Sequence, residues 1–253
     1  MDPVLTTPGG VRAVLADTAL LGPAFTFAVD AEEAGRAHLV PLARLLDGPG
    51  VLRTQLDAAA ETLRTHEDRV AASWLYGGMA ARLVAPVLAA ATVHGALPVL
   101  TGVDLRWRGH DAPRGASWWL ASPRLVSWRD PDELHGEIVG PLAGLAAALL
   151  DTVAVSERLL WGEVATAVAK ATRVVATARP AAATPVRALA AALLDRPPLA
   201  GTRTPGGGRS TCCLAYRVPG GHTCADCPLG AGRAGADVLA RRPRTGRAPA
   251  GPD

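Results

Sequence analysis

The fold class is indicated by residues 156–178, which read SERLLWGEVATAVAKATRVVATA. Apolar residues recur in this stretch every three or four positions, which is the spacing of one face of an α-helix. Ser156 is a favoured N-cap residue, so the helix is expected to begin at Glu157. The segment therefore predicts a helix over Glu157–Ala178.

The same helical spacing runs through most of residues 1–195. Further helix starts are indicated by cap residues and by prolines at the first helical position. The other helices expected are Ala31–Leu46 with a bend at Pro41, Val51 to about Ala85 with a break at Gly77-Gly78, Pro131 to about Leu150, and Pro185 to about Asp195.

Residues 101–128 depart from this pattern. Apolar and polar residues alternate over Val103–Trp107, a turn-rich stretch follows over Gly109–Gly115, and Ala116–Leu120 is again mostly apolar. Two such runs around a turn predict a β-hairpin. The expected fold class is therefore mostly α with a small β-hairpin (α+β), followed by an irregular C-terminal module.

The composition fits a globular protein. The 253 residues are 49% hydrophobic and 19% charged, with a formal net charge of +3. A chain of this length can bury enough apolar surface to fold without disulfides. The moderate charge argues against a wholly disordered chain and against a dedicated nucleic-acid-binding protein, so no nucleic acid is expected as a partner.

The N-terminal residues Met1–Gly10 contain neither a basic region nor an apolar stretch, so we recognise no secretory signal and expect a cytosolic protein. Thiols stay reduced in the cytosol, where a cysteine cluster more often binds metal or is redox-active than forms disulfides. Residues Leu83–Val103 lack charged side chains, but they contain Gly95 and two prolines. We expect a buried helix there rather than a membrane span.

The chain changes character after Asp195. Prolines and glycines over residues 196–208 predict a linker, and nine arginines against three aspartates give residues 196–253 a net charge of +6. Residues 1–195 carry a net charge of −3. These shifts divide the chain into a mainly helical domain (1–200), a cysteine-containing module (201–236) and a disordered basic tail (237–253).

All four cysteines lie in the basic module, as Cys212-Cys213, ten residues, Cys224, two residues, Cys227. Four thiolates are the ligand set of a [2Fe-2S] or [4Fe-4S] cluster and also of structural zinc. Zinc sites usually take ligands from two C-x2-C knuckles, and only Cys224–Cys227 is one. Adjacent cysteines chelate one tetrahedral ion poorly, whereas two irons offer more widely placed sites.

Residues 212–229, CCLAYRVPGGHTCADCPL, resemble the C-terminal cluster motif of FhuF-type ferric-siderophore reductases. The resemblance implies that Cys212, Cys213, Cys224 and Cys227 bind a [2Fe-2S] cluster. Upstream, residues 73–80, SWLYGGMA, resemble a looser part of the same family. The helical domain would then be the siderophore-binding part of the protein.

The function implied by this resemblance is one-electron reduction of Fe(III) in a siderophore, with release of Fe(II) in the cytosol. We find no credible nicotinamide or flavin fingerprint, so the electron is expected from a separate donor, a ferredoxin or an NAD(P)H-dependent reductase. The expected partners are this donor and a ferric siderophore. The expected location is the cytoplasm, and peripheral association with the inner face of the membrane is compatible with it.

Two alternative functions remain open on the sequence alone. One is a zinc-stabilised interaction module without redox activity. The other is an accessory protein that binds a siderophore without reducing it.

Further residues are candidates for tuning the cluster. Arg209, Arg217 and Arg233 supply positive charge that would favour the reduced cluster. His222 lies in the cluster loop and could hydrogen-bond a sulfur, and Gly220-Gly221 could turn backbone N–H groups toward sulfur. Three tryptophans would be core residues by default but could line a pocket for a large siderophore: Trp107, Trp118 and Trp119.

Overall fold

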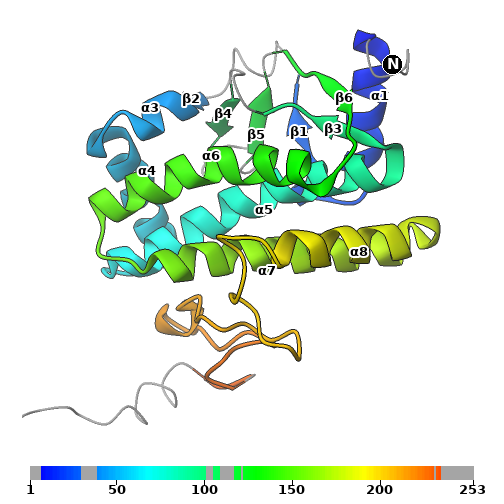
Figure 1. Cartoon of the computed structure of the whole chain (residues 1–253). Coiled ribbons are helices and arrows are strands. Elements are labelled where there is room, and N and C mark those ends of the chain that lie inside the picture. Colours follow the sequence, from blue (N-terminus) through cyan, green and yellow to red (C-terminus); the bar gives the residue numbers. More distant parts are fainter. Residues whose placement is uncertain are drawn as a thin grey trace, which may run out of the picture.

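One long helix, α5 (Asp68–His94), runs through the centre of the molecule (Figure 1). The structure, a computed structural model, describes residues 7–29, 39–100, 105–108, 117–120, 122–230 and 232–234. Most side chains of α5 are buried, and the helix ends at Gly95, whose φ of 62° suits a glycine after a helix C-terminus. A helix that is apolar on nearly every side needs neighbours on every side.

Helices supply most of these neighbours. α7 (Glu157–Ala178) lies beside α5 and runs in the same direction, while α4 (Pro49–Leu63) and α6 (Pro131–Thr152) pack on other sides (Figure 1). α8 (Ala183–Leu194) returns along α7, and α1 (Pro8–Ala19) contacts α5. The short helix α3 (Leu42–Leu46) packs against α4 and α6.

Two small sheets complete this helical body. The first has the strand order β1 (Phe27–Ala28), β5 (Ser117–Leu120), β4 (Leu105–Arg108) and β2 (Leu39–Pro41), with β1 parallel to β5 and the other pairs antiparallel. The second pairs β3 (Ala96–Pro98) with β6 (Leu125–Ser127) antiparallel. The expected fold class, mostly α with a small β element, is confirmed.

The first sheet is joined to the helices through its tryptophans. Trp107 and Trp118 are fully buried, with ring centroids 5.0 Å apart. The indole N–H of Trp118 donates to the carbonyl of Met79 in α5 at 2.9 Å. The sheet therefore belongs to the same hydrophobic core as the helices.

Several expected elements are found at their predicted positions. α7 spans Glu157–Ala178 as predicted, and α6 begins at Pro131 with the Asp130 carboxylate accepting the N–H groups of Asp132 and Glu133. Strands β4 and β5 pair antiparallel as the hairpin prediction requires. The expected turn over 109–115 lies outside the described residues.

Two predicted helices are wrong in part. α5 continues through Gly77-Gly78, and the chain breaks instead at residues 64–67, where Arg64 adopts a left-handed conformation (φ 52°). Gly77 is held in the helix by packing, because a Cβ there would lie 2.9 Å from the Glu163 carboxylate. Leu39–Pro41 is strand β2 and not helix, and residues 31–38 lie outside the described residues.

Two helices, α5 and α6, are long and apolar enough to cross a membrane on composition alone. In α5, 67% of the apolar window is buried inside the protein, and the residues from Leu83 to Ala91 are all buried. This burial agrees with the expected core helix over the first part of Leu83–Val103. In α6 the buried share is 39%.

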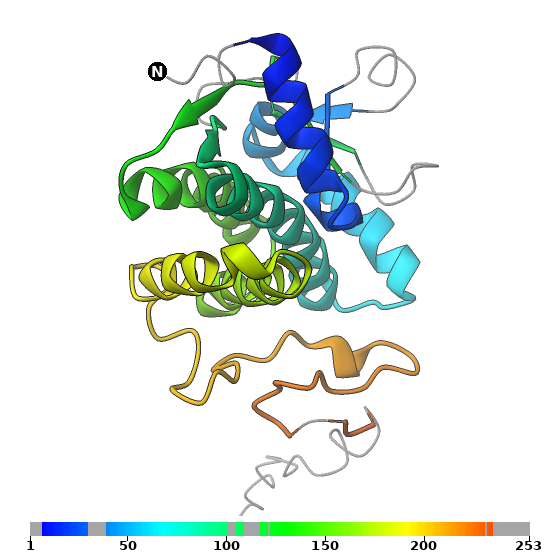
Figure 2. The ribbon, with the colours of Figure 1, turned by 90° about the vertical axis from the view of Figure 1, so that its right-hand side faces the viewer.

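After α8 the described chain contains turns, the 3-10 turn η4 (Ala215–Arg217) and two isolated bridges, Arg203 with Arg209 and His222 with Ala234. We call residues 195–234 the C-terminal segment. It lies below α7 and α8 in Figures 1 and 2, on the side away from α1. The domain boundaries at 200 and 236 stay predictions, and the tail over 237–253 lies outside the described residues.

Candidate metal centre

The C-terminal segment brings the four cysteines together from two loops. The Cys213 and Cys224 sulfurs lie 3.4 Å apart, and none of the four cysteines forms a disulfide. Cys227 is buried, and it is close enough to Cys212 and Cys224 for its charge to raise the pKa of both. The sequence spacing therefore folds into one group of thiols.

Within this group one sulfur is favoured as a thiolate. Hydrogen bonds from the thiols of Cys212 and Cys224 lower the pKa of Cys213 to about 2. The same hydrogen bonds raise the pKa of Cys212 and of Cys224, because each donates its proton to the Cys213 sulfur. A thiolate is the form that binds metal, so the group is prepared for ligation.

Two of the sulfurs are spaced as ligands of one metal ion would be. Two thiolates about 2.3 Å from one tetrahedral metal lie roughly 3.8 Å apart, close to the separation of Cys213 and Cys224. Among the described residues, no three His, Cys, Asp or Glu side chains are gathered around one ion position. The separation of Cys213 and Cys224 therefore suits two ligands of one metal ion, whether that ion stands alone or belongs to a binuclear centre.

Backbone groups from the turn after the vicinal cysteines face the sulfurs. The N–H of Leu214 donates to the Cys212 sulfur at 3.4 Å, and the N–H of Ala215 contributes to the low pKa of Cys213. The Gly221 N–H donates instead to the Val218 carbonyl at 2.9 Å. The expectation that Gly220-Gly221 supplies N–H groups to sulfur is therefore not met for Gly221, which has a packing role: its Cβ would lie 2.2 Å from the Ala215 carbonyl oxygen.

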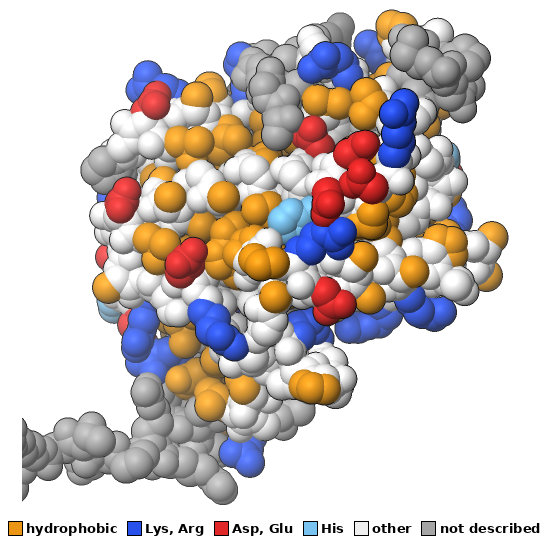
Figure 3. Space-filling model, in the orientation of Figure 1, with side chains coloured by type: hydrophobic (Ala, Val, Ile, Leu, Met, Phe, Trp, Pro, Cys, Tyr) orange, Lys and Arg blue, Asp and Glu red, His pale blue; other side chains and the backbone are white. Residues whose placement is uncertain are grey.

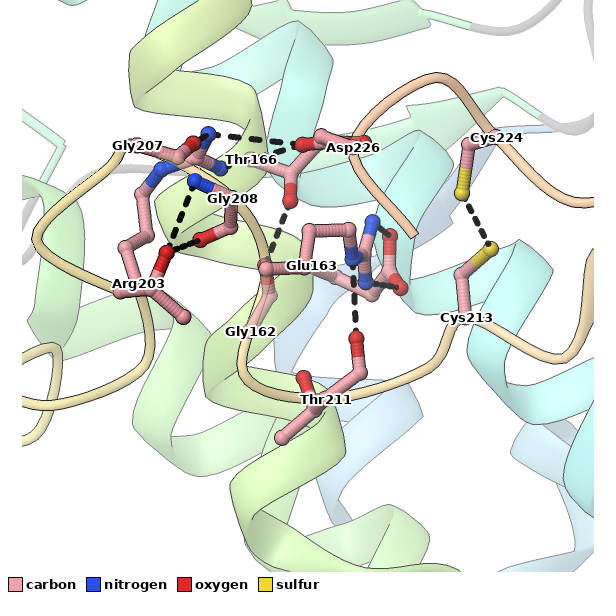
Figure 4. A network of polar contacts seen from close by, with 12 residues as sticks. Gly162, Glu163, Thr166, Arg203, Gly207, Gly208, Thr211, Cys213, Cys224 and Asp226 are labelled. Carbon is pink, nitrogen blue, oxygen red and sulfur yellow. Dashed lines mark hydrogen bonds and ion pairs between the residues drawn. The ribbon is translucent and has the colours of Figure 1, made fainter. Parts of the chain in front are cut away.

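Two close contacts fix the cysteine loops on α5 and α7. The Ser73 hydroxyl in α5 donates to the Cys213 carbonyl at 2.8 Å. Thr211 packs directly on Gly162 of α7, where a Cβ would lie 2.1 Å from the Thr211 hydroxyl oxygen (Figure 4). The upstream stretch 73–80 therefore touches the cysteine module in space, although 140 positions separate Ser73 from Cys213.

A buried ion pair lies between these two contacts. The Arg209 guanidinium binds the Glu163 carboxylate of α7, and its Nε donates to the Thr211 carbonyl at 3.1 Å (Figure 4). The side chains of Arg209 and Glu163 are only 3% and 11% exposed. Burial raises the pKa of Glu163, and the Arg209 charge opposes this shift. Burial alone would lower the pKa of Arg209, but Glu163 and the charges of Cys213 and Cys224 raise it.

A second ion pair joins the segment to the start of α5. The Arg217 Nε donates to both Glu67 carboxylate oxygens, at 2.8 and 2.7 Å. Partial burial acts to raise the pKa of Glu67, but Arg217 and Arg69 outweigh it and the pKa lies below its usual value. Arg217 is therefore an anchor between the segment and α5.

A cavity of about 580 Å³ lies between the segment and the helices, within the usual size range of ligand sites. Cys213 and Cys224 line it from the segment, Trp74 and Arg82 from α5, and Lys170 from α7. Figure 3 shows Lys and Arg side chains along the lower edge of the helical body, next to the segment. Two of the four cysteines thus face a hollow large enough for a ligand.

The predicted tuning and substrate residues lie elsewhere. Arg217 is paired with Glu67, and the backbone of His222 forms a bridge with Ala234. Arg209 is also paired, with Glu163, and its charge acts to lower the pKa of Cys213. The tuning roles of Arg217 and His222 stay predictions. None of the three predicted tryptophans lines the cavity. Trp107 and Trp118 are fully buried in the core, where Trp118 also donates to α5, and Trp119 is 9% exposed with Arg106 over its ring. Their part in substrate binding stays a prediction.

Five residues of the site were missed as site residues from the sequence, and one of them, Arg82, carried no signal among the many arginines of the chain. Trp74 and Ser73 lie in the stretch 73–80, whose resemblance to the family could have indicated them. Lys170 is the single lysine of the chain, and its isolation among arginines was a weak signal. Glu163 carried no signal, because a glutamate on an amphipathic helix is ordinarily exposed.

The comparisons with known proteins agree with this geometry. Residues 209–229 match the family model of the FhuF 2Fe-2S C-terminal domain, a stretch that runs from Arg209 through all four cysteines. No curated protein matches the chain. The C-terminal segment of this chain therefore carries a [2Fe-2S]-binding domain of the FhuF type, which makes the protein an iron–sulfur protein related to siderophore iron.

Proposed function

We propose that the protein is a ferric-siderophore reductase of the cytoplasm, with Cys212, Cys213, Cys224 and Cys227 holding the [2Fe-2S] cluster. The observation that carries the proposal is the cavity, which Cys213 and Cys224 line from the C-terminal segment while Trp74 and Lys170 line it from α5 and α7. A ligand in this space lies beside the sulfurs, where an electron can pass without a bond to the protein. Peripheral contact with the inner face of the membrane is compatible with this location.

When bound, the cluster supplies one electron at a time. The substrate Fe(III) gains that electron and becomes Fe(II), and no proton has to be moved by a side chain. The protein's own residues therefore act by holding the chelate near the sulfurs. Trp74 and the exposed Lys170 line the space that the chelate would occupy.

Reduction is the step that releases the metal. Hydroxamate and catecholate oxygens are hard anionic ligands that suit Fe(III), and they hold the softer and less charged Fe(II) far more weakly. The external donor, a ferredoxin or an NAD(P)H-dependent reductase, then returns the protein to its reduced state. This donor is part of the proposal.

The proposal is tested with anaerobically purified protein that has been chemically reduced. A ferric siderophore should reoxidise it, with Fe(II) trapped by a ferrous chelator, and NADPH alone should not reduce it. The rate should saturate with siderophore concentration and fall when a gallium complex competes. Trp74→Ala should raise the half-saturation concentration and leave the cluster spectrum unchanged. Reoxidation that never saturates and is no faster than by ferric citrate would overturn the proposal.

The ligand assignment has its own test. Purified protein should contain about two irons and two acid-labile sulfides per chain, and replacing any one cysteine by serine should bleach or destabilise the cluster. One zinc without sulfide after anaerobic preparation would instead support a zinc-stabilised module. If protein with an intact cluster binds a siderophore saturably but transfers no electron to it, the result would support the alternative of an accessory protein that binds siderophores without reducing them.

A further inference from the structure

The four cysteines divide between two sides of the site. Cys213 and Cys224 line the cavity between the C-terminal segment and the helices. Cys212 and Cys227 do not line it. Cys227 is buried, and the Cys212 sulfur accepts a hydrogen bond from the N–H of Leu214 at 3.4 Å. Each of the two cysteine loops therefore places one of its cysteines at the cavity and the other outside the cavity wall.

The two cysteines at the cavity come from different loops, and their sulfurs point toward each other (Figure 4). The Cys213 and Cys224 sulfurs lie 3.4 Å apart, close to the roughly 3.8 Å that separates two thiolates on one tetrahedral ion. Sulfurs on different irons of a [2Fe-2S] cluster lie farther apart, because the irons and their bridging sulfides stand between them. The distance therefore assigns Cys213 and Cys224 to the same iron.

The sequence motif alone suggests another pairing. A C-x2-C knuckle commonly gives both of its cysteines to one ion, which would pair Cys224 with Cys227. That pairing leaves the adjacent Cys212 and Cys213 to share the other iron, and adjacent cysteines chelate one tetrahedral ion poorly. It also joins Cys224, which lines the cavity, to Cys227, which is buried and does not line it. The arrangement of the four cysteines therefore argues against the knuckle pairing.

The remaining alternative pairs Cys213 with Cys227, and it puts on different irons the two sulfurs that lie 3.4 Å apart. If Cys213 is instead joined to Cys224, Cys212 is left with Cys227. Cys227 is close enough to Cys212 for its charge to raise the pKa of Cys212. Each iron is then held by one cysteine of each loop, so iron binding connects the two loops twice.

The cavity side of the site is also attached to the helices. The Ser73 hydroxyl of α5 donates to the Cys213 carbonyl at 2.8 Å, and the next residue of α5, Trp74, lines the cavity. One helix thus holds the backbone of Cys213 and forms a wall of the cavity. The position of Cys213 relative to the cavity is therefore set by α5.

We propose that Cys213 and Cys224 bind the iron that faces the cavity, and that Cys212 and Cys227 bind the other iron. The pairing rests on the [2Fe-2S] cluster of the matched domain and holds whether or not the protein is a reductase. The orientation rests on the proposed function, because it makes the iron of Cys213 and Cys224 the one nearer to a bound chelate. The site thus has a substrate side and a far side.

Double serine variants test the pairing, because every variant replaces two sulfur ligands by oxygen. In Cys213→Ser/Cys224→Ser both oxygens should fall on one iron, so half of the Mössbauer absorption of the oxidised protein should stay at its native position. In Cys224→Ser/Cys227→Ser each iron should gain one oxygen, so all of the absorption should shift. The matched control, Cys212→Ser/Cys213→Ser, should also shift all of it. Half of the native absorption retained in Cys224→Ser/Cys227→Ser, but not in Cys213→Ser/Cys224→Ser, would overturn the pairing.

The native protein supplies a measurement that does not require variants to keep their iron. One-electron reduction leaves one ferrous and one ferric iron, whose coupled spins give the β-protons of their cysteines different temperature dependences in the paramagnetic NMR spectrum. The Cys213 and Cys224 signals should share one dependence, and the Cys212 and Cys227 signals should share the other. A dependence shared by Cys224 and Cys227, or by Cys213 and Cys227, would overturn the pairing.

A gallium siderophore complex, which cannot be reduced in this way, tests the orientation. Its binding should shift the Cys213 and Cys224 signals more than the Cys212 and Cys227 signals. The reverse order would overturn the orientation and leave the pairing. If neither gallium nor ferric complexes bind saturably, the proposed function fails and the orientation fails with it, while the Mössbauer and temperature data still decide the pairing.

Discussion

Arg209 and Arg217 lie eight positions apart in the cysteine module, and the structure gives them different partners. Arg209 is buried against Glu163 and its charge acts on Cys213 and Cys224, whereas Arg217 is bound to Glu67 at the start of α5. A positive charge close to the sulfurs favours the cluster state with the additional electron. Arg209 is therefore expected to set the reduction potential, and Arg217 is not.

Arg209→Gln should lower the reduction potential by on the order of 50 mV, equivalent to about 1 kcal/mol for one electron. Arg209→Lys should lower it less, because the charge is kept, and Arg217→Gln should leave it nearly unchanged. Spectroelectrochemical titration of the three variants measures this, with iron content confirming that the cluster is intact. A larger shift in Arg217→Gln than in Arg209→Gln would contradict this ranking.

At the scale of elements, the tightest backbone approach between α7 and the cysteine module is at Gly162. In Gly162→Ala the new methyl would overlap Thr211, so docking should weaken by about 1–3 kcal/mol and the cluster should be lost several-fold faster. Gly136→Ala on α6 is the matched control, because no atom lies within 4 Å of a Cβ there and the change should stabilise by about 0.5–1 kcal/mol. In both variants, cluster bleaching measures the rate of cluster loss, and circular dichroism measures the folding of the helices.

If Gly162→Ala loses its cluster no faster than Gly136→Ala, then Thr211 does not need close contact with α7. The thermal unfolding temperature of the helical body should stay nearly the same or rise in both variants. The two readouts separate a docking defect from a general loss of stability.

The elements also show where sequence reasoning succeeds and where it stops. α6 and α7 were predictable because their caps and apolar spacing are local properties of the chain. The Gly77-Gly78 break was predicted from the weak helix preference of glycine, and packing against Glu163 overrides that preference. The cysteine group was predictable from its spacing, whereas Trp74, Arg82 and Lys170 are brought together only by the packing of α5 against α7.

For the whole molecule, the uneven charge along the sequence acquires a structural meaning. Arginines of the basic C-terminal segment pair with carboxylates of the acidic helical body, Arg196 with Asp132, Arg209 with Glu163 and Arg217 with Glu67. The sequence showed the two net charges but not that they attract within one chain. Only the buried Arg209 pair is sheltered from salt.

Removal of the cluster should leave the helical body folded and loosen the C-terminal segment from Arg217 onward, while the Arg209 pair and the packing of Leu214 keep the preceding residues on the helices. Helical circular dichroism should persist, while trypsin should cut after Arg217 and Arg233 faster than in the holoprotein and should still spare the buried Arg209. Added salt should speed cleavage after Arg217, because its ion pair is partly exposed. Mass spectrometry of the fragments identifies the sites. Loss of all helical signal on cluster removal would contradict this separation.

Leu214 gives the vicinal cysteines one more property. It adopts a left-handed conformation (φ 64°), which costs an L-residue roughly 1–2 kcal/mol relative to a right-handed one. Its side chain packs against the hydrophobic core, which glycine could not do, and its N–H reaches the Cys212 sulfur. The folded body thus holds the turn in its binding shape before iron arrives. Part of the conformational entropy that chelation would otherwise lose is already lost on folding, so assembly of the centre begins from a preorganised half-site.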